Sequence, residues 1–209
     1  VKPAPITSAP GTKECKFWGL GGDGTVGANK NSTKIIGDHT DKYIQAYFQY
    51  DSKKTGGVTI SHLRFGKEPI KSTYYVNKAD FIACHNISYV DKYDITGDLK
   101  DGSNLLLNCD WSIDELSARL PAKFKRDIAL AKANLYTVDG VGIAREIGLG
   151  NRINMILQSA FFKIANIIPL DDAVKYMKEA VVKSYGKKGQ AVIDQNYAAI
   201  DKGIENVKK

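Results

Sequence analysis

The chain has 209 residues and a formal net charge of +7, and 43% of its residues are hydrophobic and 25% charged. This length predicts one domain, or at most two small ones, with enough residues to bury a sizeable core. The composition is typical of a soluble globular domain and excludes a low-complexity chain. The positive charge favours anionic partners such as nucleotides, phosphates or an acidic protein surface. A basic surface that faces only solvent fits equally well.

The cysteines and the apolar runs narrow the class of protein further. Cys15, Cys84 and Cys109 are odd in number and far apart, and no C-x-x-C pair occurs. This argues against a zinc or iron–sulfur site built by this chain alone. Three scattered thiols indicate a reducing setting, so we expect a cytoplasmic protein. The sequence contains no signal peptide and no run of about 18 apolar residues, so it predicts no membrane span.

The N-terminus is interpreted as a linker that enters a domain. Residues 1–13 contain three of the six prolines and the chain starts without Met, which suggests a piece of a longer polypeptide or a processed chain. The domain is expected over residues 14–209.

A glycine-rich stretch follows the first expected strand, at residues 14–19. The helix after it is expected from Thr25 to Ile36, with Asp23 or Thr25 as N-cap and Gly37 as its end. A strand, a glycine turn and a helix start can together hold a phosphate, because glycines let the backbone approach and the helix start offers free N–H groups.

The remaining elements alternate between strands and helices, which predicts an α/β fold. Its architecture is expected to be a three-layer sandwich with a helical C-terminal third, and a hairpin over 43–65 makes its central sheet mixed. Strands are expected at 43–50, 58–65, 79–84, 104–109 and 135–138. Helices are expected from the capping box at Ser112, from Pro121 to about Ala133, from Asp139 to about Gly148 or Gly150, and over 153–164, 170–185 and 190–207.

The glycine stretch partly matches the motifs of two kinds of cofactor site. Gly19, Gly21 and Gly24 fit the G-x-G-x-x-G spacing of dinucleotide-binding folds, and Asp51 ends the second strand. A hairpin with two lysines follows Asp51 instead of a crossover helix, which disfavours NAD(P).

The second reading is a magnesium site for thiamine diphosphate. The segment 22–24 reads Gly-Asp-Gly and matches the first half of that motif, but the Asn pair of the second half is missing. Two cations at Lys53 and Lys54 would repel magnesium, so this match is interpreted as a decoy.

Lys53 and Lys54 lie in a glycine-containing turn, where they could bind phosphate together with the loop from Gly19 to Thr25. The alternative is a solvated hairpin tip, which is the commoner fate of such a pair. Arg64 could bind a phosphate or a carboxylate.

Five segments, taken in order, resemble the gamma-type domain of pyruvate:ferredoxin (flavodoxin) oxidoreductases, which is the third domain of their long single-chain form. They are residues 17–30 (FWGLGGDGTVGANK), 50–57 (YDSKKTGG), 61–66 (SHLRFG), 150–155 (GNRINM) and 196–199 (NYAA). The resemblance covers about residues 14–205. Two small departures are Gly22, where Ser is expected, and Ile87, where Pro is expected.

The resemblance implies that the whole enzyme decarboxylates pyruvate oxidatively with CoA, and that electrons leave to ferredoxin or flavodoxin. It places thiamine diphosphate, Mg²⁺ and 4Fe–4S clusters in other domains or subunits of the same enzyme, so this chain is expected to bind none of them alone. It links the gamma-type domain to CoA. The expected contact residues are Gly19, Gly21, Gly22, Gly24, Thr25, Asn29, Lys53, Lys54 and Arg64.

Two alternatives stay open. The domain could be a purely structural module that braces the catalytic domains, with the glycine loop only a tight turn, or it could be a Rossmann-like nucleotide-binding domain. No recognition motif for nucleic acid accompanies the positive charge, so no nucleic-acid partner is expected.

Overall fold

A six-stranded mixed sheet forms the centre of the molecule. The computed structural model describes residues 6–53, 56–71 and 73–209. The strand order is β2-β3-β1-β4-β5-β6, in which β1, β4, β5 and β6 run parallel and β3 pairs antiparallel with both β1 and β2. The strands are β1 (Lys13–Leu20), β2 (Tyr43–Tyr50), β3 (Val58–Gly66), β4 (Ala79–Cys84), β5 (Leu99–Asn108) and β6 (Asn134–Val138).

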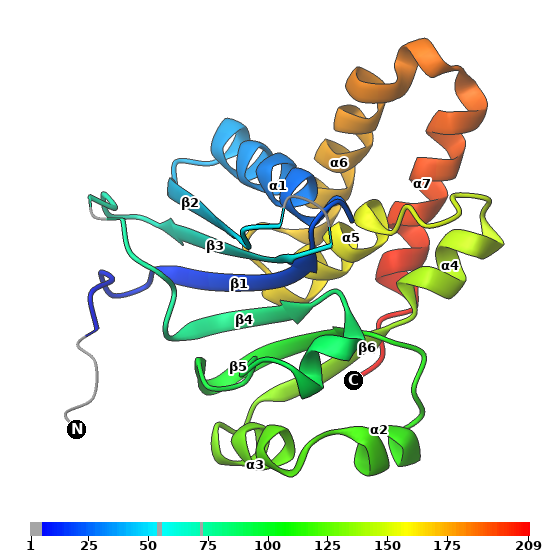
Figure 1. Cartoon of the computed structure of the whole chain (residues 1–209). Coiled ribbons are helices and arrows are strands. Elements are labelled where there is room, and N and C mark those ends of the chain that lie inside the picture. The colour runs from blue at the N-terminus through cyan, green and yellow to red at the C-terminus, as the bar shows by residue number, and fades with distance from the viewer. Residues whose placement is uncertain (1–5, 54–55, 72) are drawn as a thin grey trace.

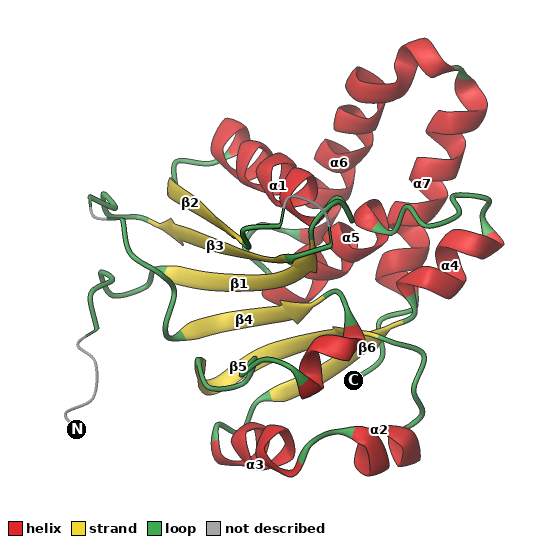
Figure 2. Ribbon diagram, viewed as in Figure 1, coloured by secondary structure: helices red, strands yellow, loops and turns green. Residues whose placement is uncertain are grey.

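Helices cover both faces of this sheet and complete the three-layer α/β sandwich (Figures 1 and 2). One layer contains α1 (Thr25–His39), α4 (Gly140–Glu146), α5 (Asn154–Ala165), α6 (Leu170–Tyr185) and α7 (Gln190–Glu205). The other contains the 3₁₀ helix η1 (Ile87–Asp91), α2 (Ile113–Arg119) and α3 (Ala122–Leu130), and a second 3₁₀ turn, η2 (Gly186–Lys188), joins α6 to α7. The expected fold class and the mixed sheet are confirmed.

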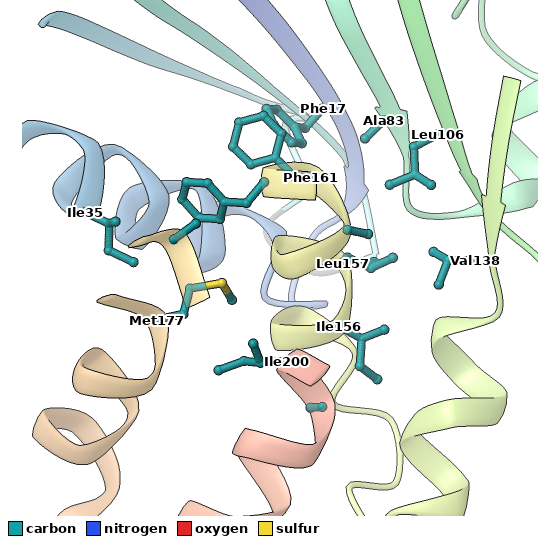
Figure 3. Close-up of a cluster of buried hydrophobic side chains, with 14 of the residues drawn as sticks. Phe17, Ile35, Ala83, Leu106, Val138, Ile156, Leu157, Phe161, Met177 and Ile200 are labelled. Carbon is teal, nitrogen blue, oxygen red and sulfur yellow. The ribbon is translucent and has the colours of Figure 1, made fainter. Parts of the chain in front are cut away.

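The larger core lies between the sheet and α5 (Figure 3). Phe161 on α5 packs against Phe17 of β1 and Phe81 of β4, with ring centroids 5.1 and 5.2 Å away. Residues 156–162 of α5 are all buried, because the sheet covers one side of the helix and α6 and α7 cover the other. The nearly all-apolar sequence of this helix is therefore a core sequence.

A second core occupies the opposite face. Trp18, Ile82, Leu105 and Leu107 belong to it, whereas their neighbours Phe17, Phe81, Ala83 and Leu106 belong to the first core. The alternation follows from strand geometry, since successive side chains point to opposite faces. Both faces of these central strands are apolar because both are covered.

Several boundaries differ from the expected ones. The helix α1 passes through Gly37 and ends at His39, because Ile35 and Ile36 are buried and packing outweighs the low helix propensity of glycine. The strand β5 begins at Leu99, where Ala79 of β4 pairs with it. The helix α3 ends at Leu130, α7 ends at Glu205, and Lys13 already belongs to β1 rather than to the linker.

The caps of the short helices agree with the sequence. Ser112 and Glu115 form the expected capping box of α2, and Asp139 caps α4 through a hydrogen bond from the N–H of Gly142. Within the part of the chain that the structure describes, no helix is both long enough and apolar enough to span a membrane.

Candidate anion site at the carboxyl edge of the sheet

The loop from Leu20 to Gly24 lies where β1 and β4 end side by side. From this edge the chain leaves β1 through α1 toward β2 and β3, and leaves β4 in the opposite direction toward β5. Such a reversal opens a crevice outside the carboxyl ends of the two strands, and open α/β sheets commonly bind ligands there. The helix α1 begins at Thr25, so its positive end faces the same edge.

Asp23 holds this loop in shape. One of its carboxylate oxygens accepts the N–H of Leu20 and the other accepts the N–H of Thr25, both at 2.8 Å. Asp23 thereby fills the capping role at the start of α1, although the residue in the N-cap position is Gly24. Both oxygens of Asp23 are therefore engaged by backbone N–H groups of its own loop.

Three glycines of this segment, Gly19, Gly22 and Gly24, are each required for a different structural reason. Gly22 and Gly24 have φ of +95° and +87°, which side-chain-bearing residues rarely adopt. At Gly24 a side chain would also collide with the amide of Asn154. At Gly19 the φ is ordinary, but a Cβ would lie 2.6 Å from the hydroxyl of Thr25.

The turn between β2 and β3 lies directly against the loop. The N–H of Gly21 donates to the carbonyl of Gly57 at 2.7 Å, and the N–H of Gly56 donates to the carbonyl of Gly21 at 3.2 Å. Lys53, on this turn, is exposed and pairs with no carboxylate of the described residues. Lys54 lies outside the described residues. The hairpin between β2 and β3 therefore returns beside the glycine loop, as a shared anion site requires.

Thr25 and Asn29 face the interior rather than this edge. Thr25 is 2% exposed, and its hydroxyl lies 2.8 Å from Nδ1 of His85. Asn29 is 3% exposed, and its amide nitrogen has no partner in the described part of the chain. Thr25 can offer an anion only its backbone, whose N–H is already bonded to Asp23.

His85 contacts the start of α1 through the hydroxyl of Thr25 and is itself fixed by two further hydrogen bonds. Its backbone N–H donates to the carbonyl of Trp18, and its own carbonyl accepts the side-chain amide of Asn108. Burial lowers the pKa of its imidazole to about 4, although the nearby Asp23 opposes this shift. His85 is therefore neutral near pH 7 and serves as a fixed partner of Thr25.

Arg64 lies apart from the loop. The register pairs Leu20 with Val58, so Arg64 is six residues farther along β3, or about 20 Å at the usual rise per residue. It is 1% exposed, and it donates to Glu14 at 2.9 Å and to the carbonyls of Tyr74 and Tyr75 at 2.6 and 2.9 Å. The arrangement favours a structural role for Arg64 over contact with an anion at the glycine loop.

The dinucleotide reading lacks its usual geometry. In that fold the strand carrying the acidic residue neighbours β1, but here β3 lies between β1 and β2. Asp51 is thus displaced by one strand, and its backbone N–H bonds to the carbonyl of Val58 within the hairpin.

Three neighbours of the site are not among the contact residues that the sequence predicts: Gly57, His85 and Asn154. Gly57 lies in the YDSKKTGG segment and Asn154 in the GNRINM segment. Both segments belong to the five that resemble the gamma-type domain, and this resemblance is the feature of the sequence that could have indicated these two residues. A lone histidine after a buried strand offers no comparable signal.

Comparison with known proteins decides the family. The model of the pyruvate ferredoxin/flavodoxin oxidoreductase family matches residues 14–206. The chain belongs to this family. It is 61% identical over 199 residues to the pyruvate:ferredoxin oxidoreductase of Moorella thermoacetica and 59% identical over 203 residues to the pyruvate-flavodoxin oxidoreductase of Enterobacter agglomerans. These alignments cover 95% and 97% of the chain but only 17% of each relative, so the chain spans about a sixth of their length.

Solved structures share the fold. A pyruvate oxidoreductase subunit from Thermotoga maritima superposes with a TM-score of 0.73 at 21% identity, over 95% of this chain and 98% of that subunit. A keto/oxoacid ferredoxin oxidoreductase gamma subunit from Geobacter sulfurreducens gives 0.64 at 19% identity, over 95% and 99%. The resemblance to the gamma-type domain is confirmed, and the same fold exists as a separate subunit.

Proposed function

We propose that the chain is the gamma-type domain of a pyruvate:ferredoxin or pyruvate:flavodoxin oxidoreductase, and that it holds the phosphates of CoA during oxidative decarboxylation of pyruvate to acetyl-CoA and CO₂. Its partners would be the other domains or subunits of the same enzyme, and through them ferredoxin or flavodoxin. Thiamine diphosphate, Mg²⁺ and 4Fe–4S clusters would belong to those other parts. Among the described residues, no group of three or more His, Cys, Asp or Glu side chains lies close enough together to hold a metal ion.

One observation carries the CoA proposal. The backbone bonds between Gly21 and the turn at Gly56 and Gly57 hold the turn that carries Lys53 against the glycine loop that leads into α1. An exposed cation and a helix N-terminus at one edge of the sheet together suit a phosphate. A fold relative, the 2-oxoglutarate:ferredoxin oxidoreductase of Magnetococcus marinus, was solved with coenzyme A bound, which accords with a CoA role for this fold.

The contribution of this chain would be positional. Lys53 and Lys54 would bind the charged end of CoA, and the rigid glycine loop would fix its direction. The thiol end would then reach the reacting centre formed by other domains. Binding a remote part of a substrate in this way serves the chemistry by orientation.

The first test is titration of the chain with CoA and dephospho-CoA by calorimetry at low and moderate salt. We expect binding that weakens with salt and without the 3′-phosphate. Replacing both lysines (Lys53→Ala with Lys54→Ala) should lower the affinity about tenfold or more, because two charge-assisted contacts are lost. The matched control is Lys67→Ala, which removes one exposed lysine beyond the opposite end of β3.

The same double variant in the full-length enzyme separates CoA binding from scaffolding. The proposal expects a higher apparent KM for CoA with pyruvate decarboxylation largely intact. If CoA dependence is unchanged in the enzyme and the isolated chain does not bind CoA, the chain is a purely structural module that braces the catalytic domains.

A further inference from the structure

The two outer strands of the sheet differ in how well their free edges are covered. β6 is five residues long, and Thr137 in it pairs with Lys208 near the C-terminus. At the opposite side the described sheet ends with β2 (Figure 1), which is eight residues long and contains no charged residue, proline or glycine (YIQAYFQY). Edge strands of soluble proteins are normally short, charged or covered, because an open edge pairs with other chains. The open edge of β2 therefore indicates an interaction surface.

The backbone of β2 presents hydrogen-bonding groups along this edge. The N–H of Asp51 donates to the carbonyl of Val58 at 3.1 Å, so these two residues form a hydrogen-bonded antiparallel pair. The register repeats this pattern at every second residue, and the odd-numbered residues of β2 therefore bond to β3. The N–H and carbonyl groups of the even-numbered residues, from Ile44 to Tyr50, point away from the sheet. Another extended strand can pair with them.

Aromatic side chains border the same edge. Tyr43, Tyr47 and Tyr50 are 50%, 41% and 61% exposed. The ring of Tyr47 lies 5.5 Å from that of Tyr75, which is also half exposed, and a hollow of about 340 Å³ opens beside these two rings. Apolar groups that are exposed side by side commonly mark a surface that binds another protein. This edge thus suits an uncharged, apolar partner strand.

The sequence of β2 is complementary to itself. In an antiparallel pair, opposite residues lie on the same face of the sheet, so a two-fold axis between two copies of β2 must pass through a residue. An axis at Tyr47 sets this residue opposite its own copy. It sets Gln45 opposite Gln49, two side chains of the same size and polarity. It also sets the small Ala46 opposite the large Phe48, so that the pair can pack without a clash.

The charges at the two ends of β2 fix the same axis. Asp41 and Lys42 precede the strand, and Asp51 and Lys53 follow it. The axis at Tyr47 sets Asp41 of one copy opposite Lys53 of the other, and Lys42 next to Asp51. An axis at Ala46 would instead set Asp41 opposite Asp51, and like charges directly opposite each other are destabilising. The register centred on Tyr47 is therefore the favoured one.

We propose that two copies of this chain associate through β2, as antiparallel neighbours about a two-fold axis at Tyr47, and form one sheet that continues across both molecules. The assembly stops at two copies, because each copy uses the open edge of its sheet. A pair of eight-residue strands buries less area than a standard protein interface, so the association depends on concentration. It does not depend on the CoA contacts proposed above.

The first test measures the mass of the chain in solution. Gel filtration with light scattering at about 0.1 mM should give twice the mass of one chain, and the mass should fall on dilution. Ala46→Lys puts a charge at an exposed position in the middle of the edge, and it should give a folded monomer. Val182→Lys is the matched control, because it replaces an exposed apolar side chain of α6 and should leave the mass doubled. Circular dichroism verifies that both variants are folded.

The second test measures the register. Residues opposite each other at a non-hydrogen-bonded position have Cα atoms about 4.5 Å apart, which is within the range for a disulfide. Oxidised glutathione should therefore link two Tyr47→Cys chains rapidly, since the three native cysteines are buried. Tyr43→Cys is the control, because this residue is just as exposed but lies opposite Asp51, and it should link at least about tenfold more slowly.

Three results would overturn the inference. They are a parent chain with the mass of a single copy at about 0.1 mM, a doubled mass that persists in folded Ala46→Lys, and equal rates of cross-linking by Tyr47→Cys and Tyr43→Cys. The first result would leave the edge of β2 to another part of the oxidoreductase. The third would show that the copies meet without the register centred on Tyr47.

Discussion

At the scale of single residues, two glycines of the same loop are needed for different reasons. Gly22 has a φ of +95° but open space around it, whereas Gly24 has a φ of +87° and the amide of Asn154 where a Cβ would lie. Gly22 therefore meets only a backbone requirement. Gly24 meets that requirement and also permits close packing between the loop and α5.

This difference predicts unequal costs of substitution. Gly22→Ala should lower the free energy of unfolding by about 1 kcal/mol, the usual cost of a left-handed backbone. Gly24→Ala should cost about 3 kcal/mol, because overpacking adds to the same backbone cost. Urea denaturation measures both values. Adding Asn154→Ala to Gly24→Ala should recover most of the excess, and a double variant no more stable than Gly24→Ala alone would contradict the packing argument.

At the scale of elements, β3 fixes the long connection to β4. Arg64 donates to the carbonyls of Tyr74 and Tyr75, and Nδ1 of His62 accepts the N–H of Val76 at 3.0 Å. Both side chains project from the face of β3 that faces away from α1 and α5, and this connection covers it. The polar residues His62 and Arg64 lie on that face of β3 because they form hydrogen bonds with residues 74–76 of the connection.

Removing Arg64 should therefore affect stability and not ligand binding. Arg64→Met should cost about 3 kcal/mol, because Glu14 is left buried with only Lys100, at 3.2 Å, as a cation. Arg64→Lys should recover only part of this loss, since an ammonium cannot replace a planar fork that donates to four groups, the side chains of Glu14 and Gln45 and the carbonyls of Tyr74 and Tyr75. Chemical denaturation measures the loss of stability, and titration with CoA checks that binding is unchanged. A folded Arg64→Lys chain that binds CoA much more weakly would show that Arg64 belongs to the binding site.

At the scale of the whole molecule, two buried histidines couple folding to pH. Burial lowers the pKa of His85 to about 4, and burial together with the charges of Lys16 and Arg64 lowers that of His62 to about 3. Both are neutral in the folded chain at pH 5. In the unfolded chain they bind protons below about pH 6.5. Protons therefore favour the unfolded state in this range.

Stability should accordingly be fully present above pH 6.5 and fall as the pH drops from 6.5 toward 4. Each histidine should remove about 2 kcal/mol between pH 7 and pH 5. Thermal unfolding across this range measures the slope, which His85→Gln or His62→Gln should each reduce by about half. His39→Gln is the control at the exposed third histidine. A slope that survives both buried substitutions would assign the effect to other groups.

The local features of this molecule can be predicted from its amino-acid sequence alone. The glycine loop, the capping box at Ser112, the cap at Asp139 and the extents of β2 and β4 all follow from propensities and periods that act over a few residues. The family also follows from the sequence, because five segments that resemble the gamma-type domain appear in the same order along the chain. The expected end of α1 at Gly37 was wrong, since burial of Ile35 and Ile36 outweighs a local helix-ending signal.

Which distant residues share a site depends instead on how the strands and helices pack together. Strand order and register place β3 between β1 and β2, so the turn with Lys53 meets the glycine loop while Arg64 lies at the far end of the same strand. These placements depend on how two cores fill the faces of one sheet, and no short-range pattern in the sequence specifies that arrangement.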